Sequence, residues 1–161
     1  MACATRSVPK PATDRVRRVV ASLAATDRSA AALTLRLTLA VVMFPHGGQK
    51  LFGWFGGPGL GGTMAYFESI GLPAAVGALT AIGEVVLPVL LLAGLMTRIG
   101  ALSIGAIMLG AVATQHWAYG FFMNWTGMKA GEGIEYHLLA LGIVLALGIQ
   151  GGGRLSLDRR L

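Results

Sequence analysis

Residues 74–95 read AAVGALTAIGEVVLPVLLLAGL, a run of apolar and small residues that contains one charged side chain, Glu84. At about 1.5 Å per residue, a helix over this run is long enough to cross a hydrocarbon layer about 30 Å thick. Glu84 would then lie about 15 Å from the start of the helix, near the midplane. A carboxylate at that depth costs at least about 2.5–3.5 kcal/mol, so we expect Glu84 to face protein or water.

Pro88 lies four residues after Glu84, at the position whose N–H would donate to the Glu84 carbonyl in a regular helix. Pro88 has no N–H group, so the carbonyl of Glu84 lacks its helical donor and the helix is expected to kink. Three interpretations of the acid stay open at this point. They are a structural ion pair, a group that handles a proton or a ligand, and an unpaired protonated acid.

The composition is typical of a multi-pass membrane protein. Of the 161 residues, 55% are hydrophobic, 12% are charged and 24 are glycines, which allow helices to approach closely. A soluble domain of this size would need more surface charge. The net charge of +6 is concentrated near the chain ends, so no nucleic-acid partner is expected. Cys3 is the single cysteine, which excludes an intramolecular disulfide and a cysteine metal site; no role is assigned to it.

The fold class predicted from these runs is all-α, a membrane-embedded four-helix bundle with Gly- and aromatic-rich outer connections. The expected spans are residues 30–52, 74–95, 99–117 and 133–149. Together they form a membrane domain over residues 30–158. In the third span, Ala106, Gly110 and Ala113 have the spacing of a helix contact face.

Basic segments flank this membrane domain. Residues 1–29 are interpreted as a basic cytoplasmic tail, with a short surface helix near residues 14–25, and residues 159–161 as a basic C-terminal end. Ten Lys and Arg residues lie in the tail, the 96–98 turn and the C-terminal segment, against two in the longer connections. The positive-inside rule therefore predicts that both termini lie in the cytoplasm.

Charged residues of the spans gather at two depths. Arg36 of the first span and Glu84 of the second form an inner zone, and we expect them to form an ion pair. Lys50 and Glu135 belong to an outer zone, and we expect a second ion pair between them. Both pairs would remove the cost of placing an uncompensated charge inside the membrane.

The outer polar side chains are also predicted to border a cavity that opens between the helices toward the outer leaflet. The candidate ligand-binding residues are His46, Lys50, His116 and Glu135 around its mouth and Glu84 toward its floor. A lipophilic, carbonyl-bearing ligand such as a quinone suits this arrangement. A tightly packed bundle whose polar residues pair among themselves stays open as the alternative.

Three histidines near one depth raise the question of a haem or metal site. His137 lies two residues after Glu135, about 200° around a helix, so these two cannot face one site. No pair of candidate ligands has the helical spacing of a zinc site. No metal is therefore expected, and haem is disfavoured. The chain also lacks a phosphate loop, a dinucleotide fingerprint and a nucleophile elbow, so the catalytic residues stay unknown.

Several short motifs, taken in order, resemble the DoxX family of small bacterial membrane proteins. They are an arginine in the first span (Arg36), GxxKLF at 47–52, GLP at 71–73, Glu84, AGLMTRIGAL at 93–102 and GxxRLSLD at 151–158. The resemblance covers about residues 32–158 and leaves the basic tail outside. It implies a four-helix integral membrane bundle, in agreement with the pattern of spans.

The resemblance also implies an association with redox chemistry. Some relatives are subunits of membrane oxidoreductase systems, including a quinone-linked thiosulfate-oxidising enzyme and amine-oxidation machinery. The leading hypothesis is an accessory or quinone-associated subunit of such a system, which leaves open whether the chain is itself catalytic. The alternatives are a small-molecule or proton transporter that uses Glu84, and a structural assembly subunit without ligand. Expected partners are the lipid bilayer, a redox enzyme subunit and a second copy of the chain.

Overall fold

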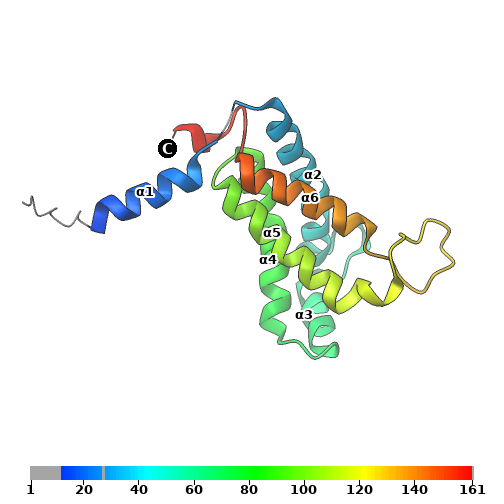
Figure 1. The fold of residues 1–161 in the computed structure, drawn as a ribbon. Coiled ribbons are helices and arrows are strands. Elements are labelled where there is room, and N and C mark those ends of the chain that lie inside the picture. The colour runs from blue at the N-terminus through cyan, green and yellow to red at the C-terminus, as the bar shows by residue number, and fades with distance from the viewer. Residues whose placement is uncertain (1–11, 27, 161) are drawn as a thin grey trace, which may run out of the picture.

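A computed structural model of the protein describes residues 12–26 and 28–160, which form helices joined by turns and loops (Figure 1). The α-helices of this part are α1 (Ala12–Ala24), α2 (Ala30–Phe52), α3 (Gly59–Ser69), α4 (Ala74–Ala93), α5 (Thr97–Ala111) and α6 (Glu135–Gln150). Shorter helical segments are η1 (Trp54–Gly56), the π-helix η2 (Val112–His116), η3 (Trp117–Tyr119) and η4 (Leu157–Arg160). The described part contains no strand, which confirms the all-α class; Cys3 lies outside it.

Apolar helices lie where the membrane spans were predicted. α2, α4 and the continuous helical segment Thr97–Tyr119 are long and apolar enough to cross a membrane. α6 is a shorter apolar helix of 16 residues. Its length of about 24 Å is less than the roughly 30 Å of a hydrocarbon core. These helices make the chain a multi-pass membrane protein.

α2 and α4 run antiparallel and approach each other closely at a glycine. A Cβ atom placed on Gly47 would lie 2.4 Å from the carbonyl carbon of Glu84, so any larger side chain must push the helices apart. The carbonyl of Glu84 therefore faces Gly47, and Pro88 has deprived that carbonyl of its helical donor. This glycine fixes the register between the two helices.

The apolar core lies where α2, α4, α5 and α6 meet. Its buried side chains include Leu39, Met43, Leu91, Ile104 and Leu147. α5 also packs on α6, and there a Cβ atom on Gly105 would lie 2.9 Å from Val144 Cγ1. Large apolar side chains on the outer faces of the helices are exposed, as expected for surfaces that contact lipid.

The two ends of the bundle are built from different segments. The terminal end comprises the start of α2, the turn at residues 94–98 and the segment 151–158. The aromatic end comprises residues 53–73 and 117–134, which are rich in glycine, tryptophan and phenylalanine. These two names are used below.

Arg36 is buried at the terminal end, with 1% of its surface exposed. Its Nη1 donates to the carbonyls of Leu91 at 2.8 Å and Leu92 at 3.1 Å, and its Nη2 donates to the carbonyl of Arg154 at 3.3 Å. The last carbonyls of a helix have no donor within the helix, so Arg36 supplies donors to the end of α4.

The expected ion pair between Arg36 and Glu84 is not formed, and the antiparallel register explains why. Gly47 lies against Glu84. Arg36 precedes Gly47 by eleven residues on α2, so it lies level with a position about eleven residues after Glu84 on α4. That position is the 94–98 turn, roughly 15 Å from the acid.

The segment 151–158 closes the terminal end over the turn between α4 and α5. The carboxylate of Asp158 accepts from the backbone N–H groups of Met96 at 2.6 Å and Thr97 at 2.9 Å, which lie at the start of α5. Ser156 Oγ donates to the carbonyl of Gly94 at 2.7 Å. A carboxylate at a helix N-terminus satisfies unpaired donors and complements the helix dipole.

Candidate functional site

A cavity of 630 Å³ lies at the aromatic end, between the end of α2, α3, α4, α5 with η2 and η3, and the last residues of the loop that leads to α6. Its walls are mainly apolar, and its polar lining is provided by Lys50, Tyr66, Thr80, Glu84, Thr114, Gln115, His116, Tyr119 and Glu132. The volume lies in the range of about 300–1,000 Å³ that is typical of small-molecule sites. A cavity is therefore present where a tightly packed bundle was the alternative.

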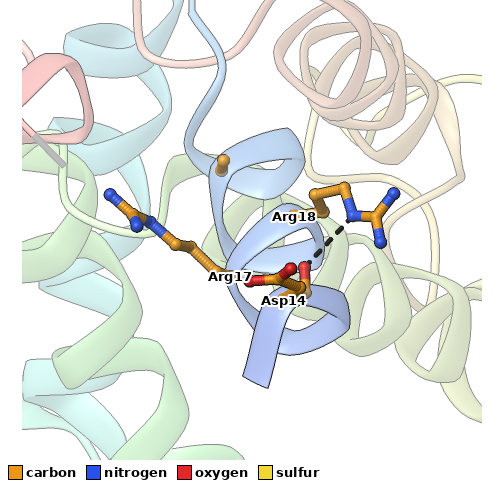
Figure 2. A pocket seen from close by; sticks show the side chains of 4 residues that line it. Asp14, Arg17 and Arg18 are labelled. Atoms are coloured by element: carbon orange, nitrogen blue, oxygen red, sulfur yellow. Dashed lines mark hydrogen bonds between the residues drawn. The ribbon is translucent and has the colours of Figure 1, made fainter. Parts of the chain in front are cut away.

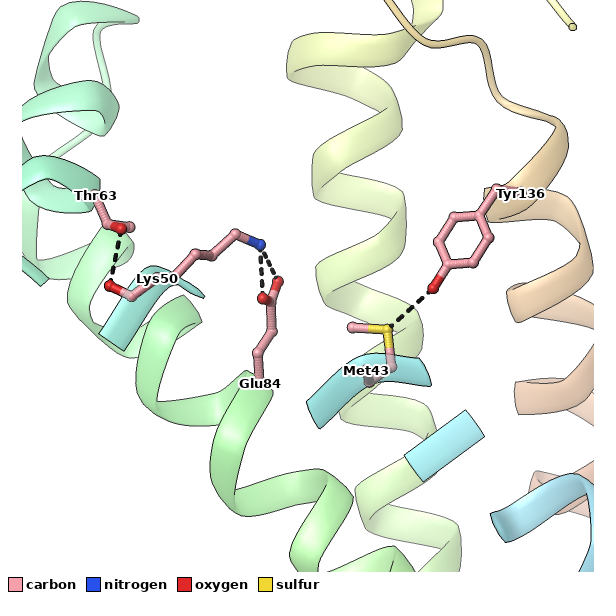
Figure 3. Close-up of polar contacts among 5 residues, drawn as sticks. All are labelled: Met43, Lys50, Thr63, Glu84 and Tyr136. Carbon is pink, nitrogen blue, oxygen red and sulfur yellow. Dashed lines mark hydrogen bonds and ion pairs between the residues drawn. The ribbon is translucent and has the colours of Figure 1, made fainter. Parts of the chain in front are cut away.

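The deepest polar feature of the cavity is an ion pair between α2 and α4. Lys50 Nζ lies 2.5 Å from Glu84 Oε1 and 2.6 Å from Oε2 (Figure 3). The Glu84 side chain is 1% exposed and the Lys50 side chain is 33% exposed, so the acid is enclosed and the amine reaches toward the cavity. The close approach at Gly47, one turn before Lys50, makes this contact possible.

The backbone carbonyl of Lys50 receives a hydrogen bond from a side chain of α3. Lys50 lies in the last turn of α2, where carbonyls lack helical donors. Thr63 Oγ1 donates to the carbonyl of Lys50 at 3.0 Å, and Thr63 is itself buried (Figure 3). α3 thus holds the end of α2 in place beside the cavity.

The opposite wall is formed by α5 and the π-helix η2. π-helices are rare and often occur at functional sites, because the wider turn changes where side chains point. Gln115 and His116 of η2 both line the cavity. Tyr66 of α3 donates its hydroxyl hydrogen to Gln115 Oε1, which joins the two walls.

His116 is held in one tautomer by the loop that follows it. Its Nδ1 lies 2.9 Å from the backbone carbonyl of Glu132. A carbonyl can only accept, so Nδ1 carries hydrogen and Nε2 is left as an acceptor in the neutral ring. The cavity lining therefore contains the Lys50 amine, which is a donor, and the imidazole of His116.

A second imidazole supports His116 from inside the bundle. The ring of His137, which is buried, lies with its centroid 4.1 Å from that of His116 at an interplanar angle of 43°. This is ring packing, in which the two imidazoles lie against each other. Within the described residues, no group of three or more His, Cys, Asp or Glu side chains is placed to hold a metal ion.

Two of the sequence-predicted site residues lie outside the cavity. His46 is on α2 and faces α6, where its ring centroid is 6.2 Å from that of Tyr136. Tyr136 in turn donates to the sulfur of Met43 at 3.5 Å (Figure 3). Glu135 Oε2 accepts from the backbone N–H of Met123 at 3.1 Å.

The expected ion pair between Lys50 and Glu135 is therefore not formed. Glu135 stands in the first turn of α6 and is used to hold the loop between η3 and α6. Lys50 instead meets Glu84, which was expected to pair with Arg36. Of the five predicted ligand-binding residues, the cavity brings together Lys50, Glu84 and His116. Their role in binding stays a prediction.

Sequence reasoning missed Tyr66 and the small residues of α5 as parts of the cavity. Ala106 and Gly110 were expected to contact another helix, but they line the cavity, and a Cβ atom on Gly110 would meet nothing within 4 Å. Thr114 continues this row at the same four-residue spacing. A stripe of small residues that ends in polar ones is a signal that could have suggested a cavity wall.

Comparisons with known proteins place the chain in a family. The DoxX family model matches residues 31–117. The "Putative oxidoreductase CatD" of Bacillus subtilis (strain 168) is 32% identical over 126 residues, which cover 78% of this chain and 83% of that protein. No solved structure matches the chain. The family match covers more than half of the sequence, and the relative is covered over most of its length, so the chain belongs to the DoxX family.

Proposed function

We propose that the protein is an accessory subunit of an inner-membrane oxidoreductase system that holds a quinone in the cavity at the aromatic end. The single observation that carries the proposal is this cavity, whose apolar walls end at Lys50, Glu84 and His116. The name of the Bacillus subtilis relative, an oxidoreductase, supports a redox context. The excess of Lys and Arg at the terminal end supports placing that end in the cytoplasm.

The chemistry of the lining suits a planar ring that carries oxygen atoms. Lys50 has three N–H donors and gives two contacts to the carboxylate of Glu84, which leaves one donor for a carbonyl oxygen. Ala106 and Gly110 present a flat wall without bulky side chains, against which a ring can lie. An isoprenoid tail would leave between the helices toward lipid. In this proposal the chain binds and orients the ring, and a partner enzyme supplies the electron transfer.

The test is direct binding of a short-chain ubiquinone analogue to the protein in nanodiscs, measured by equilibrium titration. The variant is the double substitution Lys50→Met with Glu84→Gln, which removes both charges and leaves no buried charge unpaired. We expect its affinity to fall by about tenfold or more, the loss of one charge-assisted hydrogen bond. His46→Gln is the matched control, because His46 lies at the same end of α2 but outside the cavity.

Two results would overturn the proposal. The first is a wild-type protein that neither carries quinone from its native membrane nor binds the analogue. The second is an unchanged affinity in the double variant. If proteoliposomes instead show a pH-dependent flux that Glu84→Gln abolishes, the transporter hypothesis replaces it.

A further inference from the structure

We infer that α1 lies on the membrane surface at the terminal end, with its apolar side in the lipid interface and its arginines on anionic phospholipid headgroups. This inference concerns a different part of the molecule from the cavity and does not depend on the quinone proposal. It assigns an interaction surface to the basic segment that precedes the spans.

The first observation is that the described apolar side chains of α1 are exposed. The sequence places apolar residues at positions 16, 19, 20 and 23, the spacing of one face of a helix. Of the side chains described, Val19 is 51% exposed and Leu23 is 37% exposed. Figure 1 shows why, because α1 extends away from the other helices and touches the bundle mainly near its C-terminal end.

The second observation is the positive charge around α1. Arg17 and Arg18 point to different sides of α1, and Arg18 Nε donates to the backbone carbonyl of Asp14 at 3.1 Å (Figure 2). The hollow drawn there is lined by residues of α1 alone, so it is a helix surface and not a pocket between elements. Residues 1–18 carry five Lys and Arg residues and one acid. This balance complements anionic headgroups, which bind basic amphipathic helices.

The third observation fixes α1 at the level of the bilayer surface. The segment after α1 is held to the terminal end by three contacts. Arg98 Nη2 donates to the carbonyl of Ala25 at 2.9 Å, and Gly153 N–H donates to Thr26 Oγ1 at 2.7 Å. Arg154 N–H donates to the carbonyl of Ser29 at 3.1 Å.

These contacts select lipid as the occupant of the apolar side. α2 begins at Ala30 and is itself a helix of spanning length, so the end of α1 cannot move far from the interface where α2 enters the membrane. At the membrane interface, the surroundings available to the apolar side of α1 are the lipids around the bundle. Arg17, about 110° around the helix from the middle of the apolar side, can reach the headgroups while its aliphatic stem stays against the apolar surface.

The test uses the full chain in nanodiscs of phosphatidylcholine, with or without phosphatidylglycerol. In a Cys3→Ser background, a nitroxide label is attached at Val19→Cys or, as the matched control, at Ala21→Cys, which lies about 160° away around the helix. The measurement is the accessibility of each label to oxygen, which enters lipid, and to a water-soluble nickel chelate. We expect the label at residue 19 to be exposed to oxygen and protected from nickel in the phosphatidylglycerol nanodiscs, and the label at residue 21 to show the reverse.

The headgroup contribution is tested by Arg17→Gln combined with Arg18→Gln. We expect the ratio of docked to undocked α1 to fall by about 5-fold for each arginine removed. Nickel access to the label at residue 19 should then rise to its value in pure phosphatidylcholine. Equal nickel access at residues 19 and 21 in both lipid compositions would overturn the surface docking, and would point to solvent or a protein partner. Protection at residue 19 that is the same in both compositions would overturn the role of anionic headgroups.

Discussion

The terminal end and the aromatic end both bury charged side chains, but they use them differently. At the terminal end, Arg36 donates to backbone carbonyls and Asp158 accepts from backbone N–H groups. At the aromatic end, Lys50 and Glu84 meet each other beside a cavity. Arg36 and Asp158 form their hydrogen bonds with the protein backbone. Lys50, by contrast, has one N–H donor left after its two contacts with Glu84.

The charges at the terminal end therefore have a structural role, whereas those at the aromatic end belong to a candidate binding site. A buried charge whose partners are all backbone groups supplies hydrogen bonds to the unpaired N–H and C=O groups at helix ends and turns. A buried pair beside a cavity adds little net stability over apolar residues of the same volume, so stability alone is a weak reason for its presence. The distinction predicts that substitutions at the terminal end lower stability more than substitutions beside the cavity do.

Arg36→Leu should be the most damaging change. The carbonyls of Leu91, Leu92 and Arg154 lose a charged donor. That of Leu91 keeps the N–H of Gly94 at 3.0 Å, and each buried group left unsatisfied costs about 1–3 kcal/mol. We expect the free energy of unfolding to fall by about 3–5 kcal/mol, read from thermal unfolding in detergent by circular dichroism. Arg159→Leu, an exposed arginine at the same end, is the control and should change little. Equal losses of unfolding free energy in the two variants would contradict the structural role of Arg36.

Gly47→Ala should separate α2 from α4. The new Cβ atom would lie 2.4 Å from the backbone of Glu84, so the helices must move apart and the reach from Lys50 to Glu84 lengthens. We expect a loss of about 1–3 kcal/mol, the usual cost of overpacking, in the same unfolding assay. Gly142→Ala provides a matched control within a membrane helix, because a Cβ atom there meets nothing within 4 Å. A neutral Gly47→Ala variant would refute the close approach.

The Lys50–Glu84 pair should show coupling in a double-mutant cycle. Glu84→Gln alone leaves the amine of Lys50 partly enclosed without its partner, whereas the double variant with Lys50→Met removes both charges. We expect a coupling of about 1–2 kcal/mol in unfolding free energy, reduced from that of a fully buried pair because Lys50 is partly exposed. Strictly additive single effects would argue that the two charges act independently.

Tyr66→Phe should have the smallest effect, and it should fall on ligand exchange more than on stability. The substitution removes the hydrogen bond to Gln115 that joins α3 to η2 across the cavity. We expect a bound short-chain quinone analogue to dissociate about 2- to 10-fold faster, the loss of one hydrogen bond, in a stopped-flow displacement experiment. Tyr119→Phe is the control, because this cavity tyrosine makes no hydrogen bond within the described part of the chain. Equal dissociation rates in the two variants would contradict the proposal that Tyr66 bridges the two walls of the cavity.

The positions of the helices could be predicted from the sequence because the membrane imposes a length on them. α2 begins at Ala30 and ends at Phe52, as its apolar run indicates, and α4 begins at Ala74 directly after Pro73. Hydropathy and helix rise are sufficient for such boundaries. The partners of buried charges need a further quantity, the register between helices, which depends here on Gly47.

Part of that register was nevertheless present in the sequence. If α2 ends at residue 52 and α4 starts at residue 74, an antiparallel pair places Arg36 opposite about residue 90 and far from Glu84. The pairing of Lys50 with Glu84 also needs the exact offset of the helices and the reach of the lysine stem. The direction in which His46 points, toward Tyr136 of α6, depends on which neighbour α2 meets on that side. The π-helix at Val112–His116 has no simple sequence signal, so the hydrogen bond between Tyr66 and Gln115 could not be predicted.

The segment that closes the terminal end has a consequence for the order in which the molecule is assembled during synthesis. Residues 154–158 contribute the carbonyl that Arg36 binds, the hydroxyl on Gly94 and the carboxylate at the start of α5. These residues leave the ribosome after all the apolar helices have done so. Until they arrive, the carbonyl of Gly94 after α4 and the first N–H groups of α5 lack these partners. The terminal end can therefore close only after the apolar helices have been synthesised, and a chain that stops before residue 154 would lack these contacts.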